Sequence, residues 1–406
     1  MPILLQINVD VNRGSTGRIA EQINTLARKN GWETFFMYGR DSMPCQSKVV
    51  HSGNKLQVLE HYVEHRLFDN DGLASRLATR KMVKKIDRIN PDIIHLHNIH
   101  DHWLNYRILF EYLNTLDKPV VWTMHDCWAF TGGCPHFSQM GCFRWRDGGC
   151  TNGCPIRNKF IMRRLFEKTQ KHFLLKQELL TKSPNLTIVP VSYWLESLLQ
   201  ESFLKEKKSV TIQNGIDINS FRIINVDSVR EKYGIRDNKY IIGVSSVWLP
   251  YKGWNDFLLL SRLLSSNIRL VLVGLDKAKI KEAKKHGIIG IARTQNVNEL
   301  AALYSGALCF CNLTYMDTFP TTNLESLACG TPVITYQTGG SPESVTQETG
   351  YVVEQGNLNE VFKAVKEIEL KDKEHYRNAC RQRAEKFFNM EDKFKNYIDL
   401  YESLMK

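Results

Sequence analysis

The sequence predicts an α/β protein made of two doubly wound domains, each with its own parallel sheet. Short apolar runs, several of them nearly uninterrupted, alternate with segments of helical periodicity along the chain, which is the pattern of strands buried on both faces of a parallel sheet. This alternation restarts at Tyr240 after a polar stretch over residues 217–238. A chain of 406 residues also exceeds what one hydrophobic core usually supports. We therefore predict two domains joined by that polar stretch.

The predicted strands are short and rich in aliphatic and β-branched residues. They cover residues 3–9, 93–96, 120–124, 188–191, 210–213, 240–244, 270–273, 307–311 and 333–336. Helical periodicity is clear over residues 17–29, 254–264 and 298–305. The N-terminal domain is expected to span residues 1–218 and the C-terminal domain residues 219–384. The charged helical segment 385–406 is expected to cross back to the first domain.

The charge of the chain bounds its partners and its location. A formal net charge of +11 favours a phosphorylated ligand, an anionic membrane face or a nucleic acid. Residues 157–182 carry eight Lys or Arg against two Glu, and form either a solvated helix packed by its apolar face or a docking site on an anionic membrane. No run reaches the roughly 18 apolar residues of a membrane span, and the N-terminus predicts a strand. We expect a cytoplasmic protein, with peripheral docking on the inner face of the plasma membrane as the alternative.

Ligand-binding residues are expected in loops that follow strands, because doubly wound sheets bind ligands at the carboxyl ends of their strands. The first predicted strand is followed by Gly14 and Gly17, before a helix expected to begin near Ile19. Glycines there allow the backbone to approach a phosphate or a sugar hydroxyl closely. A tight strand-to-helix turn without a ligand would have the same sequence.

A second loop, over residues 314–325, carries two carboxylates eight positions apart, Asp317 and Glu325. Pro320 is placed for a helix start, so the first-turn amides that follow it would attract a diphosphate. A carboxylate in the first turns of such a helix can accept hydrogen bonds from both hydroxyls of a ribose. Residues 338–343 repeat the arrangement after the next strand. The structural alternative is two well-capped helices with no ligand.

These residues resemble the Glu-x7-Glu signature of family 4 of the GT-B glycosyltransferases, with Asp317 at its first position and Glu325 at its second. The family's Ala-Cys-Gly-Thr-Pro-Val and Gly-Gly-x-x-Glu segments follow. Further matches are residues 14–18, 191–192, 214–217 and 252–253. The resemblance therefore extends from Gly14 to Glu343, which is most of the chain. It implies two Rossmann-like domains facing across a cleft, and a retaining transfer of a sugar from a nucleotide diphosphate to an acceptor other than water.

The resemblance also implies roles for individual residues. Asp317 would lie beside the transferred sugar, Glu325 would bind the donor ribose, and Lys252 would neutralise the diphosphate as it leaves. The other residues implied in donor binding are Gly14, Gly17, Phe319, Thr321, Thr322 and Asn323. The family usually places an Arg five or six residues before the Lys, where this chain has Val247 and Ser246. Arg293 is the candidate replacement.

Two groups of histidines are candidates, one residue for catalysis and four for metal binding. His125, followed by Asp126, matches the position of the family's His that contacts the donor sugar, although a His at a strand end can be purely structural. His95, His97, His100 and His102 cluster in the sequence. We predict no metal there, because the first two share one face of a strand and the others lie in a loop. GT-B enzymes use no Asp-x-Asp metal site, so Asp69-Asn70-Asp71 is predicted to be an exposed turn, and no cofactor is expected to be required for catalysis.

Five cysteines are concentrated between residues 127 and 154. Cys134, Cys142, Cys150 and Cys154 lie in a Gly-rich segment with little apolar material of its own, which a structural zinc would help to fold. Their spacings, with seven, seven and three residues between successive cysteines, are not the paired Cys-x-x-Cys of standard zinc sites. Reduced free thiols are the main alternative, and disulfides or a catalytic thiol are less favoured.

The stretch HDCWAFTGGCPHF at residues 125–137 resembles a subgroup of bacterial family 4 enzymes that assemble capsule, exopolysaccharide or O-antigen units on a lipid carrier. The resemblance implies a saccharide acceptor that is linked to a polyprenyl diphosphate. Trp128 and Phe130 are candidates for stacking on acceptor sugars, with buried packing as the alternative. A nucleotide-sugar 2-epimerase of the same fold is the competing enzyme class. A basic zinc-containing nucleic-acid-binding protein is less favoured, because it leaves two parallel sheets without a purpose, so no nucleic-acid partner is expected.

Overall fold

The computed structural model describes residues 1–146, 148–155, 166–235 and 239–406. The chain forms two compact units. The N-terminal unit consists of Met1–Gln213 together with Phe394–Lys406, and the C-terminal unit consists of Asn214–Lys393. The chain thus passes from one unit to the other at residue 214 and back at residue 394, where the sequence predicted 219 and 385.

The N-terminal unit contains a six-stranded, all-parallel sheet in the order β3-β2-β1-β4-β5-β6. Its strands are β1 (Ile3–Asn8), β2 (Glu33–Tyr38), β3 (Lys48–His51), β4 (Ile93–Leu96), β5 (Val120–Met124) and β6 (Leu186–Pro190). Its helices are α1 (Gly14–Lys29), α2 (Lys55–Phe68), α3 (Arg76–Ile89), α4 (Tyr106–Leu113), α6 (Thr169–Thr181) and α7 (Tyr193–Gln200), with single-turn helices η1 (Trp128–Phe130) and η2 (Ser138–Met140).

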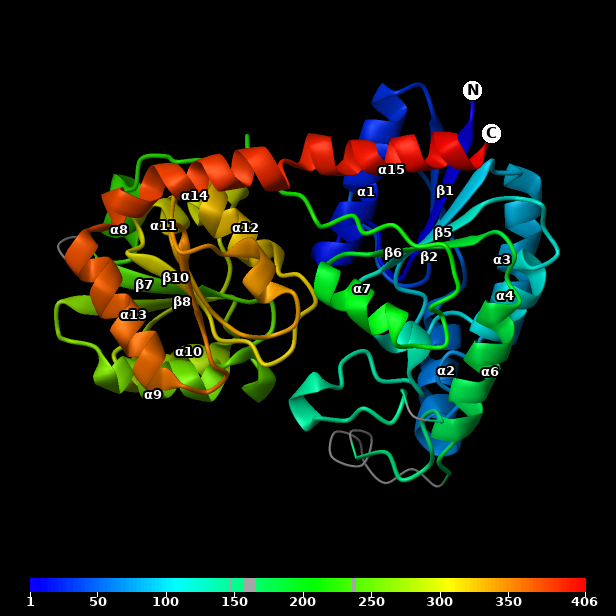
Figure 1. Cartoon of the computed structure of the whole chain (residues 1–406), viewed down its shortest axis with the longest axis horizontal. Helices are drawn as coiled ribbons and strands as arrows, with labels where there is room; N and C mark the ends of the chain where they lie inside the picture. The colour runs from blue at the N-terminus through cyan, green and yellow to red at the C-terminus, as the bar shows by residue number, and fades with distance from the viewer. Residues whose placement is uncertain (147, 156–165, 236–238) are drawn as a thin grey trace. The chain divides into compact units, whose positions relative to one another are not determined.

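The C-terminal unit contains a second six-stranded parallel sheet, in the order β12-β11-β10-β7-β8-β9. Its strands are β7 (Lys239–Val244), β8 (Ile268–Val273), β9 (Ile289–Ile291), β10 (Cys309–Asn312), β11 (Val333–Tyr336) and β12 (Gly350–Val353). Its helices are α8 (Asp227–Lys232), η3 (Pro250–Lys252), α9 (Trp254–Leu263), α10 (Lys277–Lys285), α11 (Val297–Gly306), α12 (Thr321–Ala328), η4 (Ser341–Ser344), α13 (Leu358–Lys371) and α14 (Lys373–Phe388). In Figure 1, α11, α12 and α14 cover one side of this sheet, and α9, α10 and α13 the other.

Both sheets have the strand order of a dinucleotide-binding fold, 3-2-1-4-5-6 when counted within each unit. This confirms the predicted α/β class and the two doubly wound sheets. In this topology the strand order reverses between the first and fourth strands, which opens a crevice at their carboxyl ends. The crevice lies between β1 and β4 in the N-terminal unit and between β7 and β10 in the C-terminal unit. Loops that follow these four strands are therefore placed to meet a ligand.

The core strands are apolar, but β1 and β4 also bury polar side chains. Gln6 and Asn8 on β1, His95 on β4 and His97 just after it are almost completely buried. Since buried polar groups must find hydrogen-bond partners, these residues signal an internal polar network at the crevice of the N-terminal sheet.

Helix α15 (Met390–Leu404) contributes its second half to the N-terminal unit. Tyr401 Oη is 2.6 Å from His95 Nδ1, and Thr123 Oγ1 lies 3.1 Å from Tyr397 Oη. The buried tyrosine rings thus fasten this segment to β4 and β5.

Three local predictions were wrong. Helix α1 begins at Gly14 rather than near Ile19, because the glycines form the first turn of the helix and not a loop. Residues 210–213 form no strand: they run beside β6 through hydrogen bonds from Val210 N to Ile188 O and from Ile212 N to Pro190 O, but only an isolated bridge at Ser209 results. Asp69 is fully buried rather than part of an exposed turn, since its carboxylate accepts a hydrogen bond from Lys168 N at 2.7 Å.

The segment 157–182 is only partly described. Its residues 157–165 lie outside the described residues, residues 166–168 precede α6, and Lys182 follows the end of that helix. Within α6, Lys176 is 1% exposed and its ammonium lies 4.0 Å from the centroid of the Trp128 ring. This cation is therefore part of the packing of the unit. In the described residues, no helix has both the length and the hydropathy that a membrane span needs.

Candidate active site

Lys252 and Asp317 meet at the crevice of the C-terminal sheet. Lys252 follows β7 and Asp317 follows β10, the two strands that flank the crevice. Lys252 Nζ lies 3.0 Å from Asp317 Oδ2 and donates a second hydrogen bond to Met316 O, also at 3.0 Å. Both side chains keep about a quarter of their surface exposed, 27% for Lys252 and 23% for Asp317. Both charged groups are therefore accessible from solvent, and their hydrogen bonds fix their positions.

The loops that carry this pair are joined through their backbones. Tyr315 N donates to Tyr251 O at 2.8 Å. Gly253, with a φ of +77°, lies so close to the neighbouring loop that a Cβ atom there would be 2.3 Å from Leu313 O. Only glycine tolerates both the positive φ and this short distance. Gly253 is therefore required because the loops after β7 and β10 come close together here.

Asp256 on α9 anchors the same loop from below. Its Oδ2 atom accepts hydrogen bonds from Tyr315 Oη and Tyr336 Oη, each at 2.7 Å. Tyr315 belongs to the loop of Asp317, whereas Tyr336 belongs to β11. One carboxylate oxygen thus ties the loop to the sheet. The sequence analysis missed Asp256, for which the local sequence gives no signal.

Helix α12 begins at Thr321 and its N-cap is Pro320. Within the described residues no side chain caps this end, so the first-turn amides of Thr321 and Thr322 are placed to meet an anion. Phe319, one residue before the cap, is buried, and its carbonyl accepts a hydrogen bond from Asn214 Nδ2 at 3.1 Å.

Asn323 was also predicted to bind the nucleotide-sugar donor. In this structure its polar groups form hydrogen bonds within the C-terminal unit. Its N–H donates to Pro320 O at 3.2 Å. Its side chain accepts from Asn312 Nδ2 at 2.8 Å and donates to Ser344 Oγ at 2.9 Å. The residue is fully buried. It thus joins the start of α12 to the end of β10 and to η4.

Glu325 lies in the second turn of α12 and is 8% exposed. Its Oε2 accepts a hydrogen bond from Tyr304 Oη on α11 at 3.0 Å. Because Glu325 is buried, the hydrogen bond from Tyr304 helps to fix the position of its carboxylate. The sequence analysis did not identify Tyr304, which the helical periodicity of α11 marks only as a core residue.

Arg293 lies apart from the Lys252–Asp317 pair. It is exposed and follows β9, the edge strand of the sheet, with β8 between it and β7. Its role as a replacement for the family's Arg stays a prediction.

In the N-terminal unit, Gly14 and Gly17 lie in the first turn of α1, beside the carboxyl end of β1. Gly14 has a φ of +65°. A Cβ atom on Gly17 would be 2.8 Å from Asp10 O, so the helix start packs directly on the chain that leaves β1. Both glycines therefore have a structural reason to be glycine, and their donor-binding role stays a prediction.

His125 lies at the end of β5 and contacts His97, which follows β4. The two rings are joined by a hydrogen bond of 3.0 Å between His97 Nδ1 and His125 Nε2. Burial lowers the pKa of His125 to about 4, with the neighbouring Asp126 opposing this shift. Burial, with His95 and His125 nearby, holds the pKa of His97 well below 6.5. Both imidazoles are thus neutral near pH 7.

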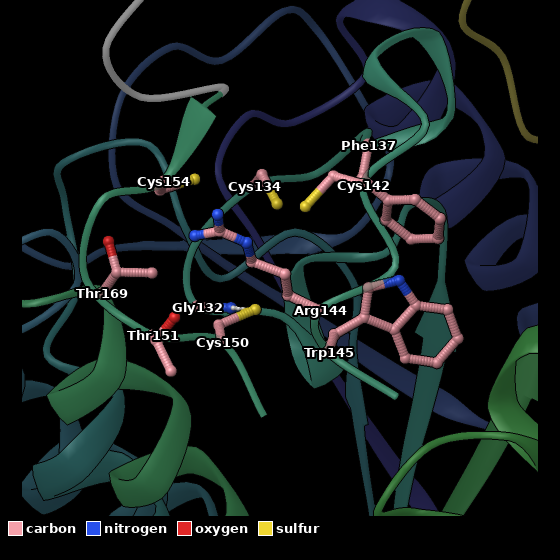
Figure 2. Close-up of a pocket in the computed structure, with 10 residues that line it drawn as sticks. All are labelled: Gly132, Cys134, Phe137, Cys142, Arg144, Trp145, Cys150, Thr151, Cys154 and Thr169. Carbon is pink, nitrogen blue, oxygen red and sulfur yellow. Dashed lines mark hydrogen bonds between the residues drawn. The ribbon is translucent and has the colours of Figure 1, made fainter. Parts of the chain in front are cut away.

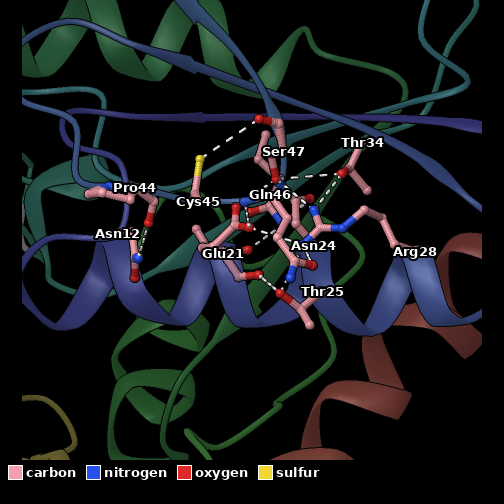
Figure 3. A network of polar contacts seen from close by, with 12 residues as sticks. Asn12, Glu21, Asn24, Thr25, Arg28, Thr34, Pro44, Cys45, Gln46 and Ser47 are labelled. Atoms are coloured by element: carbon pink, nitrogen blue, oxygen red, sulfur yellow. Dashed lines mark hydrogen bonds and ion pairs between the residues drawn. The ribbon is translucent and has the colours of Figure 1, made fainter.

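A chain of buried hydrogen bonds fixes which nitrogens of these rings carry protons. It begins at the Glu21 carboxylate, which can only accept; Ser47 Oγ donates to it at 2.6 Å. Figure 3 shows this part of the network, in which Asn24 Nδ2 donates to Ser47 Oγ at 2.8 Å. Gln6 Nε2 in turn donates to Asn24 Oδ1 and to Ala20 O, each at 2.9 Å.

The amide oxygen of Gln6 must then face His97. Gln6 Oε1 is the partner of His97 Nε2, so this nitrogen is the donor and Nδ1 of the neutral ring is the acceptor. His125 Nε2 therefore donates to His97 Nδ1, which leaves Nδ1 as the acceptor atom of His125. The hydrogen-bond chain that starts at Glu21 selects a single tautomer of the candidate catalytic histidine.

Asp126 and His100 form a buried ion pair next to His125. His100 Nε2 lies 2.8 Å from Asp126 Oδ2, and the two side chains are 13% and 12% exposed. Burial disfavours the charged forms, but the His100 charge outweighs it and lowers the pKa of Asp126 to about 2. In the same way Asp126 and Asp101 raise the pKa of His100 well above 6.5. A cavity of about 10 Å³ lies against these residues, which is room for a water and not for a sugar.

Trp128 and Phe130 are 3% and 0% exposed. Trp128 packs on Tyr106 with ring centroids 5.4 Å apart. Phe130 packs on Trp145 at 4.9 Å. Neither ring is open to a sugar in this structure, so their assignment to the acceptor requires the segment to move and stays a prediction.

The four predicted metal-binding cysteines surround one small cavity. Figure 2 shows it lined by Cys134, Cys142, Cys150 and Cys154, with Arg144 among them. Its volume is about 10 Å³. All ten cysteines of the chain are described, and all are free thiols. The predicted reason for a metal was partly wrong, because the segment has an aromatic cluster of its own in which Phe130 and Phe137 pack on Trp145 at 4.9 and 5.1 Å.

Sequence analysis did not identify the network behind His125. This network runs through Gln6, Asn24 and His97. Of these three residues, the sequence pointed only to His97, and only as a possible metal ligand. A signal was present in β1, where Gln6 and Asn8 interrupt an otherwise apolar strand at a period of two. Such alternation in a buried strand indicates that one face meets polar partners.

Two family models match the chain, one in each half. The model described as "Glycosyltransferase Family 4" matches residues 14–220, and the one described as "Glycosyl transferases group 1" matches residues 225–387. A putative colanic acid biosynthesis glycosyl transferase of Escherichia coli K12, WcaC, is 24% identical over 371 residues, which cover 86% of this chain and 87% of that protein.

Solved structures of low sequence identity share the fold. The sucrose-phosphate synthase of Thermosynechococcus elongatus superposes with a TM-score of 0.73 at 16% identity, over 100% of this chain and 99% of that one. Anabaena HepE in complex with UDP superposes with a TM-score of 0.70 at 14% identity, over 99% of this chain and 100% of that one. These likenesses extend across both units and concern the fold alone.

Proposed function

The chain belongs to glycosyltransferase family 4, and from this membership we propose that it transfers a sugar, with retention of configuration, from a nucleotide diphosphate to a saccharide acceptor in the assembly of a bacterial surface polysaccharide. The observation that carries the proposal is the Lys252–Asp317 pair at 3.0 Å, located where the strand order of the C-terminal sheet reverses and followed by the uncapped start of α12.

The C-terminal unit offers complementary groups for a nucleotide diphosphate. The first-turn amides of Thr321 and Thr322 suit the phosphates. Lys252 already uses two donor hydrogens on Met316 and Asp317, and an ammonium has a third, which we assign to a phosphate oxygen. Glu325, oriented by Tyr304, is assigned to the donor ribose. The UDP complex of HepE makes UDP the first nucleotide to test.

The proposed reaction needs no group beyond donor, acceptor and protein. The bond between the sugar C1 and the diphosphate oxygen breaks, and the acceptor hydroxyl attacks C1 from the same face. Its proton passes to the departing phosphate oxygen. Lys252 and the α12 amides stabilise the charge that develops on the diphosphate, which is the largest kind of contribution that fixed groups make to such a step.

His125 is assigned to the donor sugar. Because its Nε2 is committed to His97, Nδ1 is the atom that would accept a hydrogen bond from a sugar hydroxyl. A neutral ring is required for that role, and the low pKa of His125 provides it. The Glu21-to-His97 network would then serve to hold one tautomer ready.

The polysaccharide context rests on the relative named for colanic acid biosynthesis, which aligns over most of both chains. A polyprenyl-diphosphate-linked saccharide is the proposed acceptor. Its lipid would place the enzyme at an anionic membrane surface, which the net charge of +11 favours.

A thermal-shift screen with UDP, GDP, ADP and their sugar conjugates tests the donor assignment, because a ligand that binds only the folded protein raises Tm. We expect one nucleotide to raise Tm in the wild type and to lose most of this effect in Glu325→Ala. Tyr304→Phe, which keeps the carboxylate but removes its partner, should show an intermediate shift. No shift with any nucleotide would contradict the donor assignment.

The same preparation separates a transferase from a 2-epimerase. Incubated with the nucleotide sugar but without acceptor, an epimerase converts the sugar to its C2 epimer. A transferase releases nucleotide diphosphate only when a suitable saccharide is present. Epimer formed without acceptor would replace the transferase proposal.

A further inference from the structure

We propose that Cys134, Cys142, Cys150 and Cys154 bind one soft tetrahedral divalent cation of the zinc class, which stabilises the segment between β5 and α6. Their sulfur atoms lie around the single cavity of Figure 2. No residue assigned to donor binding or transfer takes part, so this site is independent of the proposed function.

The backbone brings these four thiols together by one repeated arrangement. Each of the four cysteines directly follows a glycine, and none of the other six cysteines does. The φ angles of these glycines are all positive: 130° at Gly133, 56° at Gly141, 93° at Gly149 and 80° at Gly153. Residues other than glycine rarely adopt this backbone conformation, so each of the four cysteines directly follows a turn that favours glycine. Cys127, in the same segment, follows Asp126 and does not line the cavity.

The chemistry and size of the cavity suit a metal ion. Cys134, Cys150 and Cys154 are at most 8% exposed, and all four thiols are reduced. The cavity volume of about 10 Å³ admits one small ion or a water. Gly132 N donates to Cys150 Sγ at 3.2 Å, a contact of the kind that orients metal ligands from the surrounding shell.

The secondary structure explains why the segment needs such a centre. From residue 125 to residue 154, leaving out residue 147, the only helices that the chain forms are the single-turn helices η1 and η2. The aromatic cluster of Phe130, Phe137 and Trp145 packs one side of it. The cysteines come from four turns on the cavity side, where one ion would join all of them at once.

One cation partly offsets the charge that a metal centre would have at this site. Binding of one Zn²⁺ by four thiols releases four protons to solvent and leaves a centre with a net charge of −2. Arg144 extends into the cavity among the sulfur atoms, where its Nη1 donates to Gly153 O at 3.1 Å. Its guanidinium is thus placed to offset the charge of a thiolate centre.

Binding requires a rearrangement of side chains. With zinc–sulfur bonds of about 2.3 Å, the sulfur atoms of a tetrahedral site lie about 3.8 Å apart. Among the described residues, only His65, Asp71 and His102 bring three ligand atoms within 4.8 Å of one another. The four sulfur atoms are therefore farther apart than in a zinc site. They must move toward the ion, and the Arg144 side chain must move out of the cavity. The histidine cluster is the competing location for a metal, and the experiment is designed to separate the two.

The test is the zinc content of protein purified without chelators, compared among variants. We expect one zinc per chain in the wild type and none in Cys142→Ser or Cys150→Ser. Cys127→Ser, a matched change in the same segment, should keep the zinc. His102→Ala should keep it as well. Zinc that persists in both thiol variants but disappears in His102→Ala would overturn the proposal and place the metal at the histidine cluster.

A second measurement uses only the wild-type chain, in case the variants do not fold. After zinc is replaced by Co²⁺, thiolate ligands give intense charge-transfer absorption, whereas a site of two imidazoles and a carboxylate gives only weak bands. We expect the intense bands, together with thiols that react with a disulfide reagent only after the metal is extracted. A wild-type chain that holds no zinc and shows no charge-transfer band with Co²⁺ would overturn the proposal.

Discussion

His97 Nδ1 and His125 Nε2 lie 3.0 Å apart, and this contact ends a directed chain of hydrogen bonds that begins at the buried carboxylate of Glu21. Starting from Glu21, each group accepts a hydrogen bond from the next one, so the donor and the acceptor at every step are fixed. The tautomer of His125 is therefore selected by side chains on β1 and α1 that are linked to it through His97.

If His97 acts through His125, their effects on catalysis will not add. His97→Ala alone should lower turnover roughly two- to tenfold, the equivalent of one net hydrogen bond of about 0.5–1.5 kcal/mol. In the His125→Ala background the same substitution should change turnover little, because the residue that it orients is already gone. Steady-state kinetics of both single variants and the double variant test this. Losses that simply multiply would show that His97 has an independent role.

Lys252 is expected to act mainly on the leaving diphosphate. Lys252→Ala should lower kcat by about 10²–10³-fold, the usual cost of losing one group that stabilises developing charge. The nucleotide affinity should fall much less, and Lys252→Arg should recover part of the rate. Kinetics combined with nucleotide titration separate the two effects. Equal losses in binding and turnover would mean that Lys252 binds the ground state and the transition state alike.

Two tyrosines that donate to the same oxygen of Asp256 make a matched pair. Each hydrogen bond is 2.7 Å long, so Tyr315→Phe and Tyr336→Phe should destabilise the fold similarly, by about 1 kcal/mol. Only Tyr315 lies in the loop of Asp317, so only Tyr315→Phe should also raise the KM for the donor. Thermal unfolding and donor kinetics provide the comparison. An equal effect of both variants on KM would argue against anchoring of the loop.

The His100–Asp126 pair predicts a pH-dependent contribution to stability. The raised pKa of His100 means that its pairing stabilises the fold fully below about pH 6.5, and that this stabilisation is lost as pH rises through the folded-state pKa. The pKa of Asp126, lowered to about 2, means that its share is present above its ordinary value of about 3.8 and is lost as pH falls toward 2.

The Tm deficit of His100→Gln relative to the wild type should therefore be largest between about pH 4 and pH 6.5 and should narrow at alkaline pH. A deficit of roughly 2–4 °C is expected for each kcal/mol lost. Thermal melts of both proteins across this range measure it. A deficit that does not change with pH would indicate that the charge of His100 is not involved.

Gly253 should be far less replaceable than glycines of similar conformation. Gly253→Ala combines a φ of +77° with a Cβ atom 2.3 Å from Leu313 O. Gly234, in the same unit, has a φ of +66° and no atom within 4 Å of its built Cβ. Gly234→Ala should cost about 1–2 kcal/mol from its backbone conformation alone, and Gly253→Ala clearly more. Similar Tm values for the two variants would rule out the close approach of the loops.

Fold elements were predictable from sequence where burial determines them. The segments that became β4, β5 and β11 were predicted at their observed bounds, since strands buried on both faces are continuous apolar runs. The start of α1 was missed because propensity assigns both glycines to a loop, whereas Gly14 has a φ of +65° and Gly17 packs closely on the chain leaving β1. Tertiary packing overrode local preference at that position.

The site was predictable only in part, for a similar reason. Asp317, Lys252 and His125 stand in recognisable local patterns that follow strands. Their supporting residues do not: Gln6 is 91 positions from His97, and Asp256 is 59 from Tyr315. Hydrogen bonds across such distances depend on the sheet topology, which brings segments together that no local pattern connects.

The tyrosines of α15 affect when the N-terminal unit can complete its folding during translation. Tyr397 and Tyr401 complete the N-terminal core, yet the about 180 residues of the C-terminal unit are synthesised before them. At translation rates of about 5–20 residues per second, roughly 10–40 s separate residue 213 from residue 394. Over that interval the N-terminal sheet is already synthesised, but α15, whose Tyr401 contacts His95, is not. The unit that is translated first is the one that can finish folding last, and chaperones would meet it in that incomplete form.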